Sequence, residues 1–170
     1  MFKLISKTIA AVAIVSVALF GSANAKTLKI ETHFTASSPN GEVAAQFAKN
    51  VEMFSGGSLK VEMFYSSSVT GKSAEVFNSA QTGIIDCDMT GAGYQTGKNA
   101  AFQFAGDVMG GYDNPYQQYD FLKFPGAQEA VDALYNKYGM TLIGWWIPGH
   151  ESLISSKPIP DVASIKDFKF

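Results

Sequence analysis

The segment that decides the fold is residues 59–89, LKVEMFYSSSVTGKSAEVFNSAQTGIIDCDM. Apolar and polar residues alternate over 59–65, which is typical of a strand with one buried face, and the short apolar run at 84–89 also favours a strand. Between them, apolar residues recur at helical spacing after Ser73, which is suited to cap a helix. A strand, a helix and a second strand in this order predict two parallel strands joined by a right-handed crossover.

The same order of elements precedes this segment. Residues 27–33 alternate as a first strand, and residues 43–54 have the spacing of a helix that Gly56 and Gly57 are suited to end. Three strands separated by two helices place the chain in the α/β class, with a parallel-stranded sheet. The helix face expected to pack inward is formed by Val43, Phe47, Val51 and Phe54, with Ala44 and Ala48 beside them.

The pattern weakens after residue 91 into glycines and aromatic residues. Residues 115–121 and 127–138 have helical spacing, and the apolar residues 140–147 predict a further strand. Neighbouring side chains on a strand point to opposite faces, so one of the two tryptophans, Trp145 and Trp146, is expected in the core. We favour Trp146 for the other position, facing a crevice at the edge of the sheet.

Residues 1–25 have the three parts of a secretory signal. Lys3 and Lys7 precede an apolar run at 9–20, and small residues follow up to Ala25. The run is shorter than the ~20 apolar residues that a membrane-spanning helix needs. We therefore expect export from the cytoplasm and cleavage after Ala25.

Three parts are expected along the chain. They are a signal peptide at 1–25, a first α/β domain at 26–150 and, at 151–170, the start of a crossover into a second domain. Residues 165–170 alternate like the start of a strand, so we interpret the sequence as the first part of a longer protein.

The charged residues exclude one class of partner. All 13 basic residues are lysines, and 15 acidic residues bring the formal net charge to −2. Binding to nucleic acid needs a basic surface, so no nucleic-acid partner is expected. Arginine, which binds a carboxylate through two parallel hydrogen bonds, is absent from the sequence. An anion site within these residues must use lysine, backbone amides or neutral donors.

The sequence has no signature of an enzyme. Its two histidines and one cysteine do not form a nucleophile with its base, or a metal cluster, at any recognised spacing. Asp86 and Asp88 could be an acid or metal pair, but carboxylates at a strand edge are more often solvated. The glycines of 91–97 depart from the spacing of a dinucleotide loop. We expect no catalytic residue, metal or cofactor, and Cys87 as a small buried residue.

The carboxyl ends of parallel strands form one edge of a sheet, where loops and helix N-termini offer unpaired donors. Four loops are expected there: residues 33–35, 66–72, 90–94 and 145–151. They contain hydroxyls, glycines, aromatic rings and one lysine. Such a set is suited to bind a small polar anion.

Five short motifs follow one another along the chain: Asn50-Val51, Ser55-Gly56-Gly57-Ser58-Leu59, Gly83-Ile84-Ile85-Asp86 with Tyr94 after it, Ser156-Lys157-Pro158-Ile159 and Ile165-Lys166-Asp167-Phe168-Lys169-Phe170. In their order and spacing the chain resembles the solute-binding proteins of TRAP (tripartite ATP-independent periplasmic) transporters, of the dicarboxylate-binding type. The resemblance extends from the first strand to the last residue.

The resemblance implies a periplasmic binding protein-like fold, in which two α/β domains close like a hinge around a ligand. It implies a small organic acid as the ligand, TRAP membrane permease subunits as partners, a periplasmic location and no enzymatic activity. We expect a monomer.

The resemblance also nominates residues by position. His150 or Glu151 lies near the place where some members carry a second arginine or a glutamine, and Lys72 could supply the missing charge. The principal carboxylate-binding arginine of the family would come directly after Phe170. Trp146 joins them because it is expected to face the crevice at the edge of the sheet. The expected ligand-binding residues are therefore Thr35, Lys72, Gly91, Trp146, His150 and Glu151.

Two other classes of function stay open at this point. One is a receptor of the same shape, such as the ligand-binding domain of a periplasmic sensor or a binding protein of another transport system. The other is a hydrolase or lyase whose catalytic groups lie outside these residues.

Overall fold

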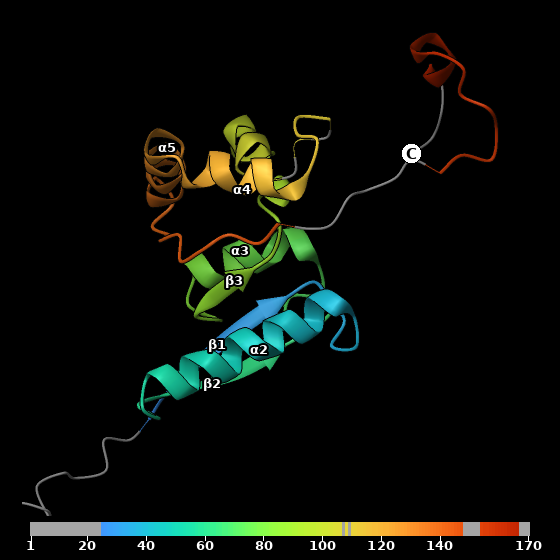
Figure 1. Ribbon diagram of the computed structural model, residues 1–170. Coiled ribbons are helices and arrows are strands. Elements are labelled where there is room, and N and C mark those ends of the chain that lie inside the picture. The colour runs from blue at the N-terminus through green and yellow to red at the C-terminus, as the bar shows by residue number, and fades with distance from the viewer. Residues whose placement is uncertain (1–24, 107, 109, 148–153, 167–170) are drawn as a thin grey trace, which may run out of the picture.

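A computed structural model describes residues 25–106, 108, 110–147 and 154–166. Its sheet has three parallel strands in the order β2-β1-β3 (Figure 1). They are β1 at Lys26–Thr32, β2 at Leu59–Phe64 and β3 at Cys87–Met89. The α/β class and the parallel pairing are thus confirmed. The third strand is shorter than the apolar run at 84–89, because the turn that ends the preceding helix includes Ile84 and Ile85, whose N–H groups both bond Ser79 O.

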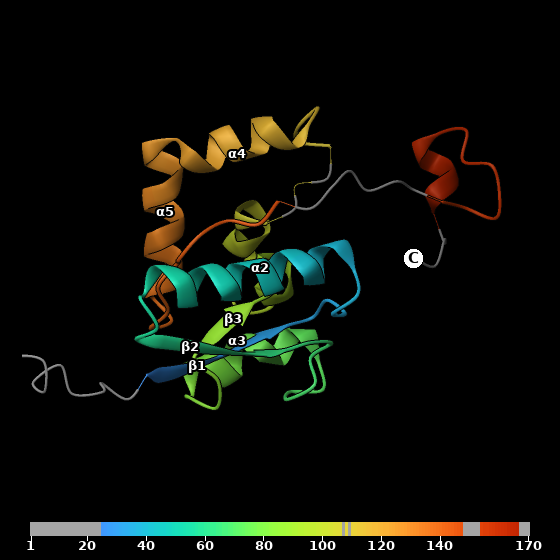
Figure 2. The ribbon, with the colours of Figure 1, turned by 60° about the horizontal axis from the view of Figure 1, so that its bottom comes forward.

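Two helices connect the strands: α2 at Pro39–Phe54 and α3 at Ser73–Gln81. Because β1 is the middle strand, the connection from β1 to β2 and the connection from β2 to β3 run across the sheet in opposite directions. Right-handed connections in opposite directions place their helices on opposite faces of the sheet. Accordingly, α2 packs on β2, whereas α3 packs on β3 and β1 (Figures 1 and 2). The sheet is therefore covered on both faces.

The details of both helices correct the sequence-based expectation. In α2, Ala44 and Ala48 are buried, but Phe54 is 80% exposed and Val43 is also exposed. Small residues face the sheet because they let the helix approach it closely. In α3, Ser73 is the first helical residue and not the cap, since Lys72 occupies the cap position without a side-chain hydrogen bond.

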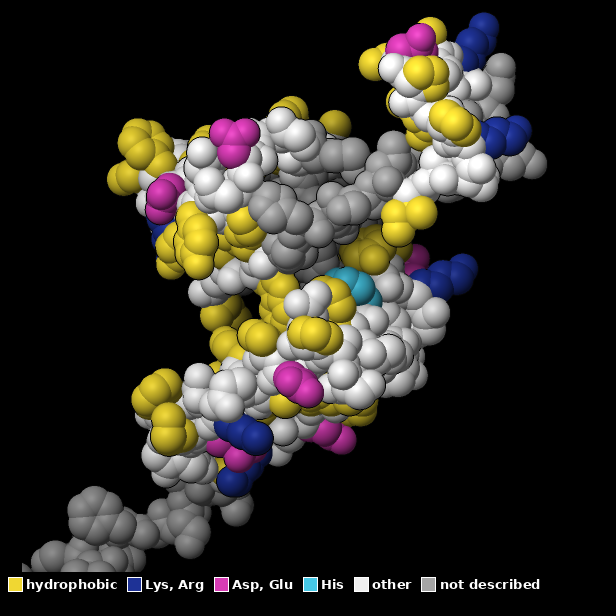
Figure 3. All heavy atoms as spheres, turned by 45° about the vertical axis from the view of Figure 1, so that its right-hand side comes forward, with side chains coloured by type: hydrophobic (Ala, Val, Ile, Leu, Met, Phe, Trp, Pro, Cys, Tyr) yellow, Lys and Arg dark blue, Asp and Glu magenta, His cyan; other side chains and the backbone are white. Residues whose placement is uncertain are grey.

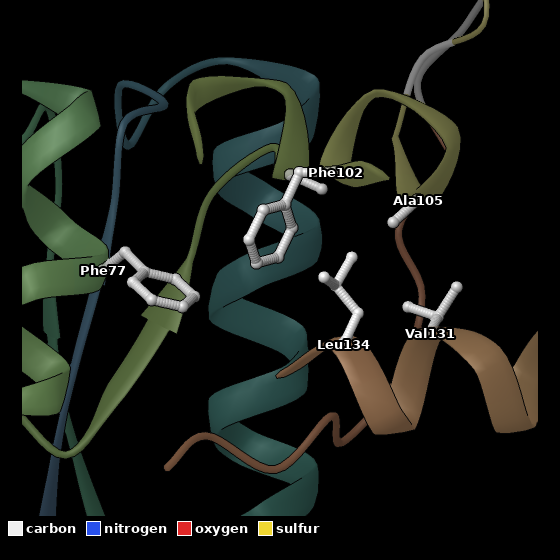
Figure 4. Packing of buried hydrophobic residues seen from close by; sticks show 6 residues of the cluster. Phe77, Phe102, Ala105, Val131 and Leu134 are labelled. Carbon is white, nitrogen blue, oxygen red and sulfur yellow. The ribbon is translucent and has the colours of Figure 1, made fainter. Parts of the chain in front are cut away.

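The principal hydrophobic core lies on the α3 side of the sheet. Beyond β3 come two 3-10 helices, η1 at Ala92–Gln95 and η2 at Ala100–Ala105, followed by α4 at Pro115–Lys123 and α5 at Pro125–Asn136. Figure 4 shows side chains from α3, η2 and α5 pointing toward one another. The cluster consists of Phe77, Ala92, Phe102, Ala105, Val131 and Leu134.

The predicted strand at 140–147 is wrong. These residues form no strand, although Met140, Leu142 and Trp145 pack against the core cluster. An apolar run indicates that its side chains are buried, but it does not show how. Here the side chains are buried by packing on α3, η2 and α5, and the backbone does not pair with another strand.

Residues 154–166 lie away from the rest of the described chain in both ribbon views (Figures 1 and 2). They include a 3-10 helix, η3, at Val162–Ile165. Ile154 is 91% exposed and Val162 is 84% exposed. Among the described residues, none of the helices has the length and apolar character needed to cross a membrane.

Candidate functional site at the carboxyl edge of the sheet

The strand order places a topological switch point between the ends of β1 and β3. After β1 the chain turns toward α2 on one face, whereas after β3 it enters η1, which contacts α3 on the other face. Loops that diverge from adjacent parallel strands leave an opening at the carboxyl edge, the position where open α/β sheets bind ligands. The loops at this edge are residues 33–38 after β1 and 90–91 after β3.

Four aromatic rings line this edge, and we refer to His33, Phe34, Tyr94 and Trp146 as the aromatic wall. The centroid of the His33 ring lies 3.9 Å from that of Phe34 and 5.4 Å from that of Tyr94. Trp146 stacks on Phe34, with 5.0 Å between centroids and 21° between ring planes. Figure 3 shows hydrophobic side chains gathered around a histidine on this face. The wall thus joins the end of β1 to two distant segments of sequence.

The β2–α3 loop, residues 65–72, is attached to the end of β1. The N–H of Ser67 donates to Thr32 O at 3.1 Å, and the N–H of Ser66 donates to Phe34 O at 2.9 Å. Ser66 and Ser67 have φ angles of 58° and 50°, a left-handed conformation that residues with a side chain seldom adopt without external contacts. These contacts hold the loop at the site and place Lys72 at the N-terminus of α3.

A side chain of β1 completes this attachment. Glu31 is 0% exposed, and its Oε1 accepts hydrogen bonds from the N–H groups of Val69 at 2.6 Å and Thr70 at 3.3 Å. Its carboxylate therefore supports the loop from below. Glu31 is not among the residues expected from sequence, because an acidic residue in an alternating strand is ordinarily assigned to the solvated face.

Asp88 on β3 is the register partner of Glu31 on β1. Burial raises the pKa of Asp88 to about 6; hydrogen bonding from Thr90 opposes this rise, and the charge of Glu31 adds to it. Burial, with a smaller contribution from the charge of Asp88, also raises the pKa of Tyr135 on α5 to about 12. Glu31 and Asp88 thus form a mostly buried acidic pair beneath the loops.

The pairing of Asp86 with Asp88 that the sequence spacing allowed is not what the structure has. Asp86 is exposed, precedes β3 and accepts a hydrogen bond from the N–H of Lys29 at 2.8 Å. A search of the described residues finds no group of three or more His, Cys, Asp and Glu side chains that could hold a metal ion. Cys87 is half-buried, with a pKa raised chiefly by burial.

The described residues nominated from sequence all lie on loops at this edge or against it. Thr35 is exposed, and its carbonyl accepts a hydrogen bond from Ser38 Oγ at 2.8 Å. Lys72 is exposed, whereas Gly91 and Trp146 are half-buried. The ring contact of Trp146 with Phe34 brings the tryptophan to the end of β1. The other two nominated residues, His150 and Glu151, lie outside the described residues.

Comparison with known proteins identifies what this chain is similar to. A family model described as bacterial extracellular solute-binding protein, family 7, matches residues 30–170. Among curated proteins, no match is found.

Several solved structures have a similar fold. A TRAP periplasmic solute-binding protein from Rhodobacter sphaeroides, in an apo open form, is 27% identical with a TM-score of 0.64, covering 69% of this chain and 37% of that one. One from Pseudoalteromonas atlantica, with bound sodium and pyruvate, is 20% identical with a TM-score of 0.62, covering 68% and 35%. A Bordetella pertussis receptor binding pyroglutamic acid is 21% identical with a TM-score of 0.58, covering 69% and 38%. The aligned part of this chain therefore spans little more than a third of the length of each.

Proposed function

Because this chain belongs to family 7 of the bacterial extracellular solute-binding proteins, we propose that it captures a small organic acid for a TRAP-type secondary transporter. The observation that carries the proposal is the carboxyl edge of the sheet, where Phe34 of the aromatic wall stacks on Trp146 and bonds the β2–α3 loop through Ser66. Similar structures bind pyruvate in one case and pyroglutamic acid in another, and both are small carboxylic acids.

The proposed site combines one positive charge with backbone donors. Lys72 stands at the N-terminus of α3, where unpaired N–H groups and the helix dipole favour an anion. Thr35 and Gly91 offer a hydroxyl and a closely approachable backbone, and Trp146 packs against the apolar part of the ligand. His150 and Glu151 complete the proposed set. Because arginine is absent from these residues, Lys72 is the group that we assign to the carboxylate.

The setting that we propose is the periplasm. A leader cleaved after Ala25 would leave Lys26 as the first residue, and Lys26 is also the first residue of β1. We propose 26–150 as the first of two domains, 151–170 as the start of the connection to the second, membrane permease subunits as partners, and a monomeric protein. As a binding protein it catalyses no reaction and needs no cofactor.

Calorimetry of the full-length protein with mono- and dicarboxylic acids tests this function. Lys72→Ala is expected to lower the affinity for the acid about ten- to a hundredfold, since a hydrogen bond to a charged group contributes ~1.5 to 3 kcal/mol. Lys49→Ala, which removes an exposed lysine of α2, is the control and should bind as the wild type does.

Repeating the titration at two salt concentrations separates contact from long-range attraction. A direct contact keeps most of its effect in high salt, whereas attraction by an exposed charge is screened. Equal affinity of the wild type and Lys72→Ala for every acid would remove Lys72 from the site. Absence of binding to any acid would overturn the function.

A further inference from the structure

We propose that Asp88 carries a proton which it donates from Oδ1 to Oε2 of Glu31, and that this proton makes the β2–α3 loop and its affinity for a carboxylate depend on pH. Glu31 is then a positioning residue that acts through the loop, and Asp88 is the group that titrates. The statement on affinity rests on the proposed function, whereas the statement on the proton and the loop does not.

The first observation is a pair of buried oxygen atoms that lack hydrogen bonds. Oε2 of Glu31 and Oδ1 of Asp88 are both buried, and neither has a hydrogen-bond partner among the residues that the structure describes. An unpaired buried oxygen of a carboxylate is costly. A single proton between the two carboxyl groups satisfies both atoms.

The second observation is that the backbone places these groups together. Glu31 and Asp88 are register partners on adjacent parallel strands, which lie ~4.8 Å apart, and partners in register project to the same face of the sheet. Two carboxylates this close disfavour double ionisation. The raised pKa of Asp88, to which Glu31 contributes, agrees with this arrangement.

The third observation decides which of the two carboxyl groups holds the proton. Oε1 of Glu31 accepts two backbone N–H groups, from Val69 and Thr70, and such bonds stabilise the ionised form. Asp88 is therefore the group that holds the proton, and Glu31 is the acceptor.

The remaining titratable groups around the pair do not neutralise it. On α5, Tyr135 lies close enough for the charge of Asp88 to raise its pKa. On α3, exposed Glu75 accepts from Asn78 Nδ2 at 2.8 Å. On η1, Tyr94 contacts the ring of His33, which follows β1. Lys98 Nζ lies 5.6 Å from the centroid of the Phe77 ring.

Two further titratable groups precede Asp88 in the sequence. Cys87 precedes Asp88, and its thiol has a raised pKa, so it stays neutral through the pH range considered. Asp86 is held at the exposed start of β3 by the N–H of Lys29. Within the described residues, no lysine forms an ion pair with Glu31 or Asp88.

Loss of the proton has a defined consequence for the loop. The second negative charge repels Glu31, and displacement of Glu31 loosens its bonds to Val69 and Thr70. That segment leads directly to Lys72, so both the added charge and the looser loop oppose binding of an anion. Affinity for a carboxylate is expected to fall about threefold from pH 5.5 to pH 8, and binding in between takes up protons.

The experiment uses the full-length protein and the variants Asp88→Asn, Glu31→Gln and Glu62→Gln. Carboxyl resonances give the titration of Asp88, and hydrogen exchange gives the protection factors of the Val69 and Thr70 amides without any ligand. Glu31→Gln keeps an oxygen that can accept from both amides but removes the charge. Glu62→Gln makes the same chemical change on the exposed side of β2 and is the control.

The expected results separate the variants. In the wild type, Asp88 titrates near pH 6 and the protection of both amides falls as it ionises. Glu31→Gln lowers the midpoint of Asp88, Asp88→Asn makes amide protection independent of pH, and Glu62→Gln behaves as the wild type does. Calorimetry shows the threefold change in affinity for the wild type and Glu62→Gln, and none for Asp88→Asn.

Several results would overturn the proposal. It is contradicted if the titration midpoint of Asp88 lies below pH 5, or if Glu31→Gln leaves that midpoint unchanged. It is also contradicted if the protection of the Val69 and Thr70 amides does not depend on pH. A gain in thermal stability on replacing choline chloride by sodium chloride contradicts it as well, since that gain would assign the pair to a bound cation. If no acid binds at any pH, the proposed function fails. The titration and exchange results then still show whether Asp88 carries the proposed proton.

Discussion

Gly41 shapes the loop that follows β1. A side-chain carbon at this position would collide with the carbonyl oxygens of Thr35 and Ala36. The N–H of Gly41 donates to Ser38 Oγ at 3.0 Å, and the Ser38 hydroxyl in turn donates to Thr35 O. A single glycine in the first turn of α2 thus lets the loop with Thr35 lie directly against the helix.

Gly41→Ala is expected to push this loop away from α2. Overpacking of this kind typically lowers the free energy of unfolding by about 1 to 3 kcal/mol, and the acid should bind more weakly because Thr35 moves. Urea unfolding and calorimetry measure the two effects. Gly97→Ala, where an added carbon meets no atom within 4 Å, is the control. A Gly41→Ala protein of unchanged stability would show that the loop adjusts freely.

Asp88 gives a prediction about stability and pH. Its pKa is raised from 3.8 to about 6 in the folded protein, so the folded state binds the proton more tightly than the unfolded state does. The stabilisation is therefore fully present below pH 3.8 and is lost as pH rises through 6. At about 1.4 kcal/mol per pKa unit, the loss approaches ~3 kcal/mol.

Asp88→Asn should therefore be more stable than the wild type at pH 8, by up to about 3 kcal/mol, and of similar stability at pH 4. Denaturant unfolding of both proteins at each pH measures the difference. A variant that is less stable than the wild type at pH 8 would refute the raised pKa.

Single residues also show where the sequence was insufficient. Trp145 packs against the core as expected, although the basis of that expectation, alternation along a strand, is wrong because residues 140–147 form no strand. Glu31 was not found, because its burial depends on residues 66–72 folding over it from the next strand. Local alternation carries no information on that contact.

At the scale of elements, α3 begins without a side-chain cap. Lys72 occupies the cap position, where serine or aspartate would bond the first turn, and its positive charge opposes the helix dipole. An element that departs from the usual start signal often does so at a functional site. In our proposal, a carboxylate ligand accepts the hydrogen bonds of the first turn that no side chain accepts.

Lys72→Ser should have effects of opposite sign on stability and binding. A serine cap is expected to raise the free energy of unfolding by about 1 kcal/mol, while loss of the charge weakens binding of the acid. Thermal unfolding and calorimetry measure the two quantities. Lys72→Gln removes the charge without adding a good cap, so it should weaken binding and leave stability nearly unchanged. If Lys72→Ser binds as tightly as the wild type, the helix N-terminus is not the anion site.

The sequence predicted the parallel strands and both crossover helices, because the alternation and the helical spacing are local. In α2 it correctly included Ala44 and Ala48, but it also included Val43 and Phe54, which are exposed, because helical spacing alone does not show which apolar residues reach the sheet. It also assigned a strand to 140–147. Whether an extended apolar segment pairs or packs depends on distant partners, here α3, η2 and α5.

At the scale of the whole molecule, residues 154–166 stand apart from the described body, with Ile154 and Val162 almost fully exposed. Large apolar side chains in such positions ordinarily mark a contact surface. The chain covers 37% of the Rhodobacter sphaeroides structure, and we expect the remainder of the full-length protein to cover this segment.

Ile154→Asp should therefore lower the free energy of unfolding of the full-length protein by about 2 kcal/mol or more, because a charge would replace a buried side chain. Ser156→Asp, a neighbouring exposed residue, should have little effect. Denaturant unfolding compares the two. If both variants are equally stable, the segment is solvated in the full-length protein as well.

The central position of β1 has a consequence for the export that we propose. In the proposed arrangement a leader directly precedes β1. β1 is then the first element of the mature chain to be synthesised, yet its neighbours come much later: Lys26 pairs with Leu59, and Ile30 pairs with Cys87. Closing loops of this length costs entropy before any pairing repays it. The first strand therefore has no partner until the second has been made, and its other edge stays unpaired until the third has been made. A nascent chain with this strand order remains unfolded for longer, and a chain that must thread through a narrow membrane channel has to be unfolded.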